Sequence, residues 1–472
     1  MILMFMGALI ITGHKMAFFF VMVMVIAGCL IYSLTVFHEA LYIFAFAIPL
    51  EQAFYAFAGG RYNTLSYLAF VLAFIWIFRF GRTMETARIS TNEKFVLFWV
   101  LWAGLSLIWT HNFVDGSKTF VTCIGGFAVL FIFSRGLKNL RYIGTCVWFY
   151  LIGTVLLTLY LLPYYKSGSA YVRVSGRFIP SAIGLGYGIA PHEVSRTYAM
   201  GMICALMLWQ YENTRLKRNI AMGLAIFLGL LVPLCLSRST VISLSMGLLA
   251  WMMFKGGKAR LAAQVKRFIT FLLLITSVVA LVSYINQEAF MTRVAMSQDE
   301  YEHGNMAQLT TGRTKIWGTA LQLIIENPIL GLGLGSFPLV YSIRTGDITR
   351  AVHNQYLNSL VELGIIGLAL FLFWIIGFGW NAWKLKTMRQ LTIAWWITIA
   401  LILVGHDIFR GKDFWLILAF ITVMARLEAV MARRTVADTL PARSARPRPC
   451  LPSQAQRKEL SRMPGPSSAT DK

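Results

Sequence analysis

GRTKIWGTALQLIIENPILGLGLGSF, at residues 312–337, is followed after a polar link by VHNQYLNSLVELGIIGLALF, at residues 352–371. Over residues 316–325, apolar side chains recur at helical spacing and polar side chains take the opposite side, which predicts an amphipathic helix. The Asn-Pro pair at residues 327–328 should end this helix, because a residue that precedes proline is driven out of the helical region. The second segment predicts a long apolar helix that begins at a His-Asn pair.

The composition of the whole chain indicates a membrane protein. Of its 472 residues, 57% are hydrophobic and 13% are charged, whereas soluble domains carry roughly 25% charged residues. Apolar runs recur along the sequence, and a helix needs about 20 apolar residues to cross the hydrocarbon layer. We therefore expect an all-α, polytopic integral membrane protein with about 12–14 transmembrane helices.

The apolar runs also give the places of the spans. We put them at residues 16–36, 39–58, 63–79, 95–110, 118–134, 141–163, 193–211, 218–236, 238–254, 268–286, 355–380, 391–409 and 414–430. Residues 1–13 are apolar but too few to span a bilayer. They fit either a short interfacial segment or an extension upstream of a start at Met16, and both interpretations stay open.

The charges of the loops indicate the orientation. The short loops 79–94, 135–141, 215–218, 255–267 and 384–389 together hold 18 Lys and Arg residues. They fall on one side of the alternating spans, which we expect to be the cytoplasmic side. The long loops 164–192 and 287–352 then face the periplasm, and the C-terminus is cytoplasmic. The side of the N-terminus depends on residues 1–13 and stays open.

These assignments divide the chain into four parts. N-terminal membrane helices occupy residues 1–286, one large periplasmic loop residues 287–354, C-terminal membrane helices residues 355–432, and a tail residues 433–472. The tail holds nine basic and three acidic residues and has too little apolar area to fold alone, so we expect it to be disordered. It is either attracted to anionic lipid headgroups or simply solvated.

Several classes of partner and site are not indicated. The net charge of +23 comes with no nucleic-acid-binding motif, and basic loops are what a membrane protein places in the cytoplasm. The six cysteines form no CxxC pair, which argues against disulfides and zinc. His192-Glu193 lacks the HExxH pattern, and no carboxylate cluster suits a metal ion. We expect no nucleic acid, no metal and no cofactor.

The glycine-rich GLGLGSF segment at residues 331–337 is not a dinucleotide fingerprint, because no strand-helix unit surrounds it. It could cradle a phosphate group, but a tight turn that lets backbones pack closely is the favoured interpretation. If the loop faces the periplasm, a cysteine placed at Ser336 should react with an impermeant thiol reagent.

The His353-Asn354 pair opens a membrane helix with a polar face. Asn354 suits the N-cap, and Asn354, Asn358 and Glu362 recur at a spacing that puts them on one face. Eight residues of helix descend about 12 Å, so Glu362 enters the apolar layer, where it needs a cavity or a partner. A histidine at a helix mouth can be structural or catalytic, and these residues alone leave both readings open.

Two arginines lie at the predicted periplasmic boundary. Arg196 follows APHEVS, and Arg238 lies in SRS between two nearly contiguous spans. Each could snorkel to the interface. Alternatively, each could bind an anion, because a guanidinium group pairs with two phosphate oxygens and keeps its charge when desolvated.

Three of these motifs resemble the O-antigen ligase and polysaccharide polymerase family of bacterial inner-membrane glycosyltransferases. The most specific is GR, W, ENPILGLGLGSF and HNQYLNSLVELGIIG over residues 312–367, followed by SRS at 237–239 and, more loosely, PHEVSR at 191–196. In the last motif, before Arg196, His192-Glu193 stands where many relatives read Pro-Asn-Glu or similar.

The resemblance implies a function and roles for the residues. The donor would be an undecaprenyl-pyrophosphate-linked glycan, and transfer to an acceptor hydroxyl would take place at the periplasmic face, apparently without a metal. His353 would be the base, Arg196 and Arg238 would hold the pyrophosphate, and Arg313 would assist. An imidazole, with an unperturbed pKa near 6.5, suits proton abstraction at neutral pH.

The resemblance leaves the acceptor open. A ligase uses lipid A-core and a polymerase uses another lipid-linked glycan, and we favour the ligase. A branch that modifies protein hydroxyls has no dedicated extra domain to support it here. A lipid-linked glycan transporter would predict paired broken helices in two corresponding halves, whereas this chain gathers its informative residues in one loop.

Overall fold

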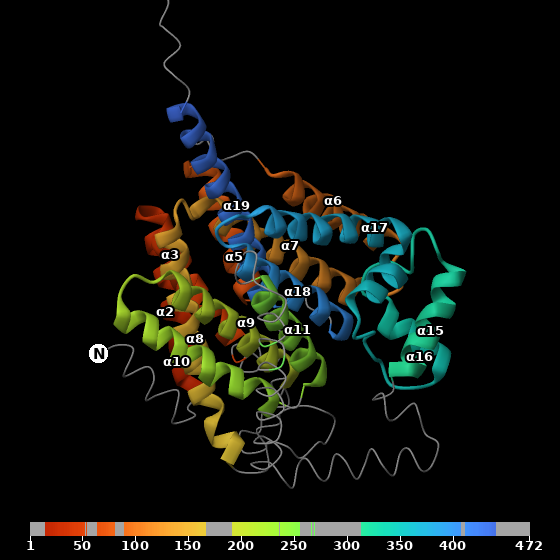
Figure 1. Ribbon diagram of the computed structural model, residues 1–472. Coiled ribbons are helices and arrows are strands. Elements are labelled where there is room, and N and C mark those ends of the chain that lie inside the picture. The colour runs from red at the N-terminus through yellow and green to blue at the C-terminus, as the bar shows by residue number, and fades with distance from the viewer. Residues whose placement is uncertain are drawn as a thin grey trace, which may run out of the picture. The chain divides into compact units, whose positions relative to one another are not determined.

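The computed structural model describes residues 15–51, 53, 64–80, 89–166, 191–235, 237–254, 266, 269, 313–406 and 411–439. All regular elements in this part of the chain are helical, which confirms the all-α prediction (Figure 1). The helices are α2 (Lys15–Thr35), α3 (Phe37–Ala47), η1 (Ile48–Leu50), α5 (Thr64–Phe80), α6 (Thr91–Leu105), η3 (Ser106–Ile108), α7 (Phe113–Gly136), α8 (Leu140–Lys166), α9 (Pro191–Tyr211), α10 (Arg215–Leu234), α11 (Arg238–Phe254), α15 (Arg313–Glu326), α16 (Phe337–Thr345), α17 (Gln355–Lys384), α18 (Arg389–Gly405) and α19 (Lys412–Thr439).

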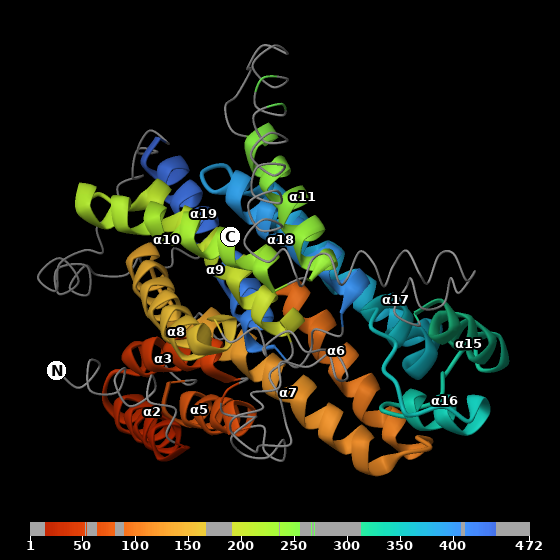
Figure 2. The ribbon, with the colours of Figure 1, turned by 90° about the horizontal axis from the view of Figure 1, so that it is seen from below.

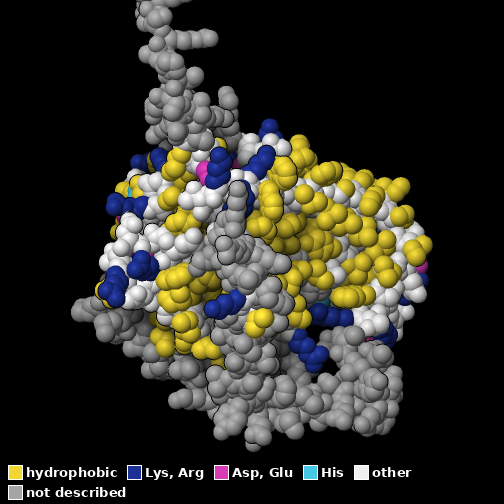
Figure 3. Space-filling view, in the orientation of Figure 1, with side chains coloured by type: hydrophobic (Ala, Val, Ile, Leu, Met, Phe, Trp, Pro, Cys, Tyr) yellow, Lys and Arg dark blue, Asp and Glu magenta, His cyan; other side chains and the backbone are white. Residues whose placement is uncertain are grey.

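The helices have the length and surface of membrane spans. Within the described ranges, five helices are long and apolar enough to cross a membrane, namely α7, α8, α10, α17 and α19, and five shorter apolar helices accompany them. Hydrophobic side chains cover the face over α6 and α17 (Figure 3), where Phe98, Phe373 and Ile376 are more than half exposed. Such a surface suits lipid, so the protein is a multi-pass membrane protein.

The structure does not describe every segment that the sequence predicts. Apart from residue 269, the predicted span 268–286 lies outside the described residues, as do the apolar residues 1–13, and the total of 12–14 spans stays a prediction. Contacts divide the chain into two units, Met1–Leu427 and Glu428–Lys472. In the second unit α19 runs to Thr439, beyond the expected start of the tail at residue 433.

Within the first unit, neighbouring helices pack in pairs. Helix α9 packs against α10, α11 against α18, α5 against α7, and α6 against α17. The pair α11 and α18 lies side by side in both views (Figures 1 and 2). Small residues permit this approach, because a β-carbon on Gly247 of α11 would collide with the Thr398 hydroxyl of α18.

Helix α17 is broken where the glycine-rich turn meets it. Gly364 has φ 65° and ψ −170°, a conformation open in practice only to glycine. The break would leave backbone groups unsatisfied in the apolar layer, but the turn supplies partners. The N–H of Gly333 donates to the Glu362 carbonyl at 2.8 Å, and the N–H of Ile365 donates to the Pro328 carbonyl at 3.0 Å. The broken helix and the turn therefore satisfy each other's backbone hydrogen-bonding groups.

The glycines of the turn are required by close backbone contacts. Gly331, Gly333 and Gly335 all have positive φ, and a β-carbon on each would lie 2.5 Å from an atom of Glu362, Thr110 or Gly116, respectively. The amides of the turn are already engaged: those of residues 331, 332, 333, 334 and 336 donate to groups within the protein. The turn therefore packs backbone on backbone, as favoured above, and these five amides are not available to a phosphate.

The segment around the turn also corrects one expectation. Ser336 is fully buried, with its hydroxyl donating to the Leu332 carbonyl and accepting from the His111 N–H, each at 2.8 Å. The expected accessibility of Ser336 is therefore wrong. The amphipathic helix α15 ends at Glu326, directly before the Asn-Pro pair expected to end it. It packs on α16 and α17 through a face that includes Ile316, while Ile325 is 79% exposed.

Replacing Gly364 with alanine should destabilise the protein. The new side chain would be held in a glycine-only conformation, at a cost of about 1–3 kcal/mol, and would also collide with the Ile329 carbonyl. Gly318→Ala is the matched control, because nothing lies within 4 Å of a β-carbon there and alanine favours the helix α15. Thermal unfolding in detergent measures both; equal unfolding temperatures for the two variants would contradict the close contact.

Candidate functional site

Five helices begin close to one another in the first unit. They are α9, α11, α15, α17 and α19, and the end of α18 lies among them. Each helix start carries a partial positive charge of roughly half an elementary charge. The side chains at these starts include most of the candidate site residues.

Three histidines come together here. The ring of His192, in the first turn of α9, stacks on the ring of His406 at the end of α18, with centroids 4.9 Å apart and planes at 4°. The ring of His353 lies edge-on to His192 at 6.4 Å and 74°. His353 precedes α17 by two positions. Imidazoles from three helix ends therefore form one group.

His353 has an unusual backbone. Its φ of 53° makes it the one residue other than glycine with positive φ in the described part of the chain. That conformation costs an L-residue roughly 1–2 kcal/mol. It persists because hydrogen bonds fix the residues on both sides of His353. The carbonyl of Val352 accepts from the Trp317 indole at 3.0 Å, and the Asn354 side chain caps α17 by accepting from the Leu357 N–H at 3.1 Å. Strain of this kind is concentrated at functional sites.

Arg196 is in a buried ion pair. Its side chain is 3% exposed, and its Nε donates to Oδ2 of Asp413 at 3.1 Å. The next ion pair joins Lys412 to Glu51 at 3.1 Å. The sequence prediction put Arg196 at the membrane boundary as an anion binder; the structure adds Asp413, whose charge offsets that of the guanidinium.

Arg313 and Arg238 stand at two of the helix starts. Arg313 is half-buried at the first position of α15, and one of its guanidinium nitrogens would lie 3.9 Å from a β-carbon on Gly405. Arg238 is exposed at the first position of α11. Its neighbour Ser239 shares a hydrogen bond of 2.5 Å with Nε2 of His406. The starts of α11 and α15 thus meet at the end of α18.

The surroundings of His192, which directly precedes the predicted span 193–211, lower the pKa of its imidazole. The pKa of His192 is lowered to about 3, first by burial and then, in the same direction, by the neighbouring His353, Arg196 and Arg313. His192 is therefore neutral at physiological pH. The groups that act electrostatically on the His192 imidazole are His353, Arg196 and Arg313, so these three candidate residues lie near it.

The polar face of α17 has a structural task. Glu362 is 3% exposed; its Oε1 accepts from the N–H of Phe337 at the start of α16, and its Oε2 accepts from the Asn358 amide at 3.4 Å. The buried carboxylate thus has the partner that its depth required. Glu362 and Asn358 hold the glycine turn and α16, while Asn354 holds the start of α17.

Sequence reasoning missed three residues of this group: His406, Ser239 and Asp413. All three are placed by contacts between distant parts of the chain. The signal that could have found two of them is the polar run GHDIFRGKD at residues 405–413, which interrupts the apolar sequence. The predicted span 391–409 covered its first half, whereas α18 ends at Gly405.

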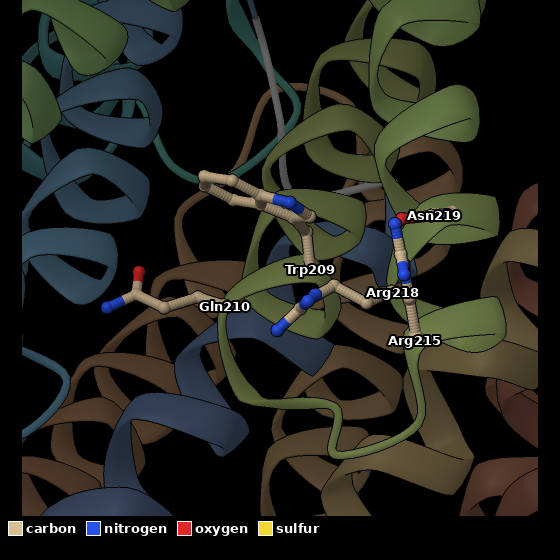
Figure 4. Close-up of a pocket in the computed structure, with 5 residues that line it drawn as sticks. All are labelled: Trp209, Gln210, Arg215, Arg218 and Asn219. Carbon is tan, nitrogen blue, oxygen red and sulfur yellow. The ribbon is translucent and has the colours of Figure 1, made fainter.

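No metal centre is evident in what the structure describes. Among those residues, no three or more His, Cys, Asp and Glu side chains are arranged to hold a metal ion. A separate basic pocket of about 480 Å³ lies between the end of α9 and the start of α10, lined by Trp209, Gln210, Arg215, Arg218 and Asn219 (Figure 4). Trp209 lies 17 residues beyond His192 on the same helix, roughly 26 Å away, so this pocket is not part of the histidine group.

One family model matches part of the chain, about a third of its length. Residues 223–372 match the family model described as O-Antigen ligase. The match supports the resemblance that the motifs carried, and it includes Arg238, Arg313 and His353 but not Arg196, His192 or His406. No curated protein matches the chain.

Breaking the buried pair should cost more than removing it. Arg196→Gln leaves Asp413 as an uncompensated buried charge and should destabilise the protein by about 3–5 kcal/mol. Arg196→Gln combined with Asp413→Asn should recover part of that loss. As a control, Asp347→Asn removes the surface pair with Lys315 (3.5 Å) and should change stability by about 1 kcal/mol or less. Unfolding in detergent compares them, and strictly additive losses in the double variant would refute the pairing.

Proposed function

We propose that this multi-pass membrane protein, whose residues 223–372 match the O-antigen ligase family model, is a glycosyltransferase that moves a saccharide from undecaprenyl pyrophosphate to an acceptor hydroxyl. The observation that carries the proposal is the meeting of five helix starts with His353 and two arginines. Cationic helix starts suit a pyrophosphate, and a nearby imidazole suits proton transfer.

The donor's pyrophosphate would lie against the helix starts. Arg313 and Arg238 are the arginines with accessible surface there. Arg196 contributes less net charge, because Asp413 is paired with it, so its role is to shape the site and donate hydrogen bonds. The helix starts add fixed partial charges that need no rearrangement as charge develops on the leaving group.

The transfer step would use His353 as the base. Its neutral imidazole takes the proton of the acceptor hydroxyl while the oxygen attacks the anomeric carbon of the donor sugar. The bond from that carbon to the pyrophosphate oxygen breaks, and its electron pair leaves on undecaprenyl pyrophosphate. Two observations support this role: His353 has a left-handed backbone, a strain of the kind that clusters at functional sites, and its ring lies edge-on to His192 within the group.

The acceptor we favour is lipid A-core, as for a ligase, with a second lipid-linked glycan, as for a polymerase, as the alternative. Purified protein in liposomes should be given a lipid-linked oligosaccharide donor and each acceptor separately. The proposal expects a new glycosidic bond to lipid A-core. Growth of the lipid-linked glycan alone would identify a polymerase, and donor movement without any new bond would contradict the glycosyltransferase.

His353→Asn should abolish most of the transfer without unfolding the protein. Asparagine tolerates the left-handed backbone of residue 353 but cannot act as a base, so turnover should fall by about 10²- to 10⁴-fold. Thermal stability should stay near that of the wild type. His38→Asn is the control, because His38 is also half-buried and stacks on Tyr142 away from the group. Near-normal turnover of His353→Asn would rule out the base.

The proposed site faces the periplasm of the bacterial inner membrane, with the C-terminus in the cytoplasm. Thr349, which is exposed after α16, is a better reporter of this orientation than the buried Ser336. In a Cys450→Ser background, the five remaining cysteines are buried. Thr349→Cys should then react with an impermeant thiol reagent in intact spheroplasts, and Lys138→Cys in a predicted cytoplasmic loop should react only after lysis. The reverse pattern would invert the topology.

A further inference from the structure

We propose that His406 is a positioning residue: through Ser239 it holds the start of α11, and with it Arg238, in the orientation that binds the donor's pyrophosphate. This inference rests on the proposed function and adds a residue outside the matched family region. It concerns donor binding rather than the proton transfer assigned to His353.

The contact between His406 and Ser239 is short and enclosed. Nε2 of His406 and the Ser239 hydroxyl lie 2.5 Å apart, and the His406 side chain is 4% exposed. The backbones of α18 and α11 are closely packed beside this hydrogen bond, because a β-carbon on Gly405 would lie 2.6 Å from the β-carbon of Ser239. Loss of this buried hydrogen bond should be destabilising, because a buried polar group without its partner costs about 1–3 kcal/mol.

One face of the His406 ring makes a further contact. The ring of His192 is stacked on it at 4.9 Å, which fixes the plane of His406 from a third helix. His192 in turn meets the ring of His353 at 6.4 Å. The imidazole of His406 therefore joins the start of α11 to the start of α9 and, through it, to the candidate base.

Arg238 lies in the first turn of α11, next to Ser239. The hydroxyls of Ser237 and Thr240 lie 2.9 Å apart within this turn, so that contact orders the turn locally but does not anchor it to another helix. Arg238 is exposed at its first position. A planar guanidinium binds phosphate oxygens in pairs only when its approach is fixed, so a small rotation of the helix start would weaken donor binding.

The geometry argues against His406 as a second base. Its Nε2 is already engaged by Ser239, and its ring is buried beneath His192. Removing it should therefore act on the affinity for the donor rather than on turnover at saturating donor.

The test compares His406→Ala, His406→Gln, Ser239→Ala and the double alanine variant in the full-length protein. Binding of undecaprenyl pyrophosphate in detergent and the donor KM are measured together with kcat. We expect His406→Ala and Ser239→Ala each to weaken binding about tenfold, the double variant to be no weaker than either single one, and kcat to change less than twofold. His406→Gln, whose amide can still reach Ser239, should restore most of the affinity.

Ser243→Ala is the matched control, because the Ser243 hydroxyl bonds only its own helix, at the Ser239 carbonyl (2.7 Å), in the contacts the structure gives it. It should bind the donor lipid as the wild type does. Unchanged binding in both His406→Ala and Ser239→Ala, or additive losses in the double variant, would overturn the inference. If His406→Ala does not fold, Ser239→Ala and His406→Gln decide it. Binding is read without turnover, so a wild type that binds but does not transfer contradicts the proposed function and not this inference.

Discussion

The close backbone contact between the glycine turn and the broken helix α17 is the constraint on which the site depends. A membrane helix tolerates a break only where other groups satisfy its backbone, and here the turn at residues 331–335 does so around Gly364. The contact fixes α16 and the first turns of α17, and Glu362 reinforces it from within the helix. His353 lies just before α17, so this assembly also sets the position of its backbone, and its ring lies edge-on to His192.

Electrostatics explains the choice of residues around His353. Five helix starts and several arginines would repel one another if every side chain there were charged. The structure lowers the net charge in two ways: Asp413 is paired with Arg196, and His192 is kept neutral by burial and by its cationic neighbours. What remains is the positive charge of Arg238, Arg313 and the helix starts, which suits the pyrophosphate site that we propose.

Much of the fold could be predicted, because its causes are local. The ends of α15, the cap at Asn354 and the glycine turn follow from proline, asparagine and glycine chemistry within a few residues. Burial of Ser336 and the roles of His406 and Asp413 could not be predicted, because they depend on partners far away in sequence: Asp413 lies 217 positions from Arg196, and His406 167 positions from Ser239. Periodicity carries no information about such contacts in an apolar bundle.

The central claim is that the helix starts around His353 form the pyrophosphate site. An experimental structure of the protein with undecaprenyl pyrophosphate bound tests it most directly. The account predicts density for the two phosphates between Arg313, Arg238 and the histidine group. Phosphate density in the basic pocket at Arg215 and Arg218, with none near His353, would contradict it.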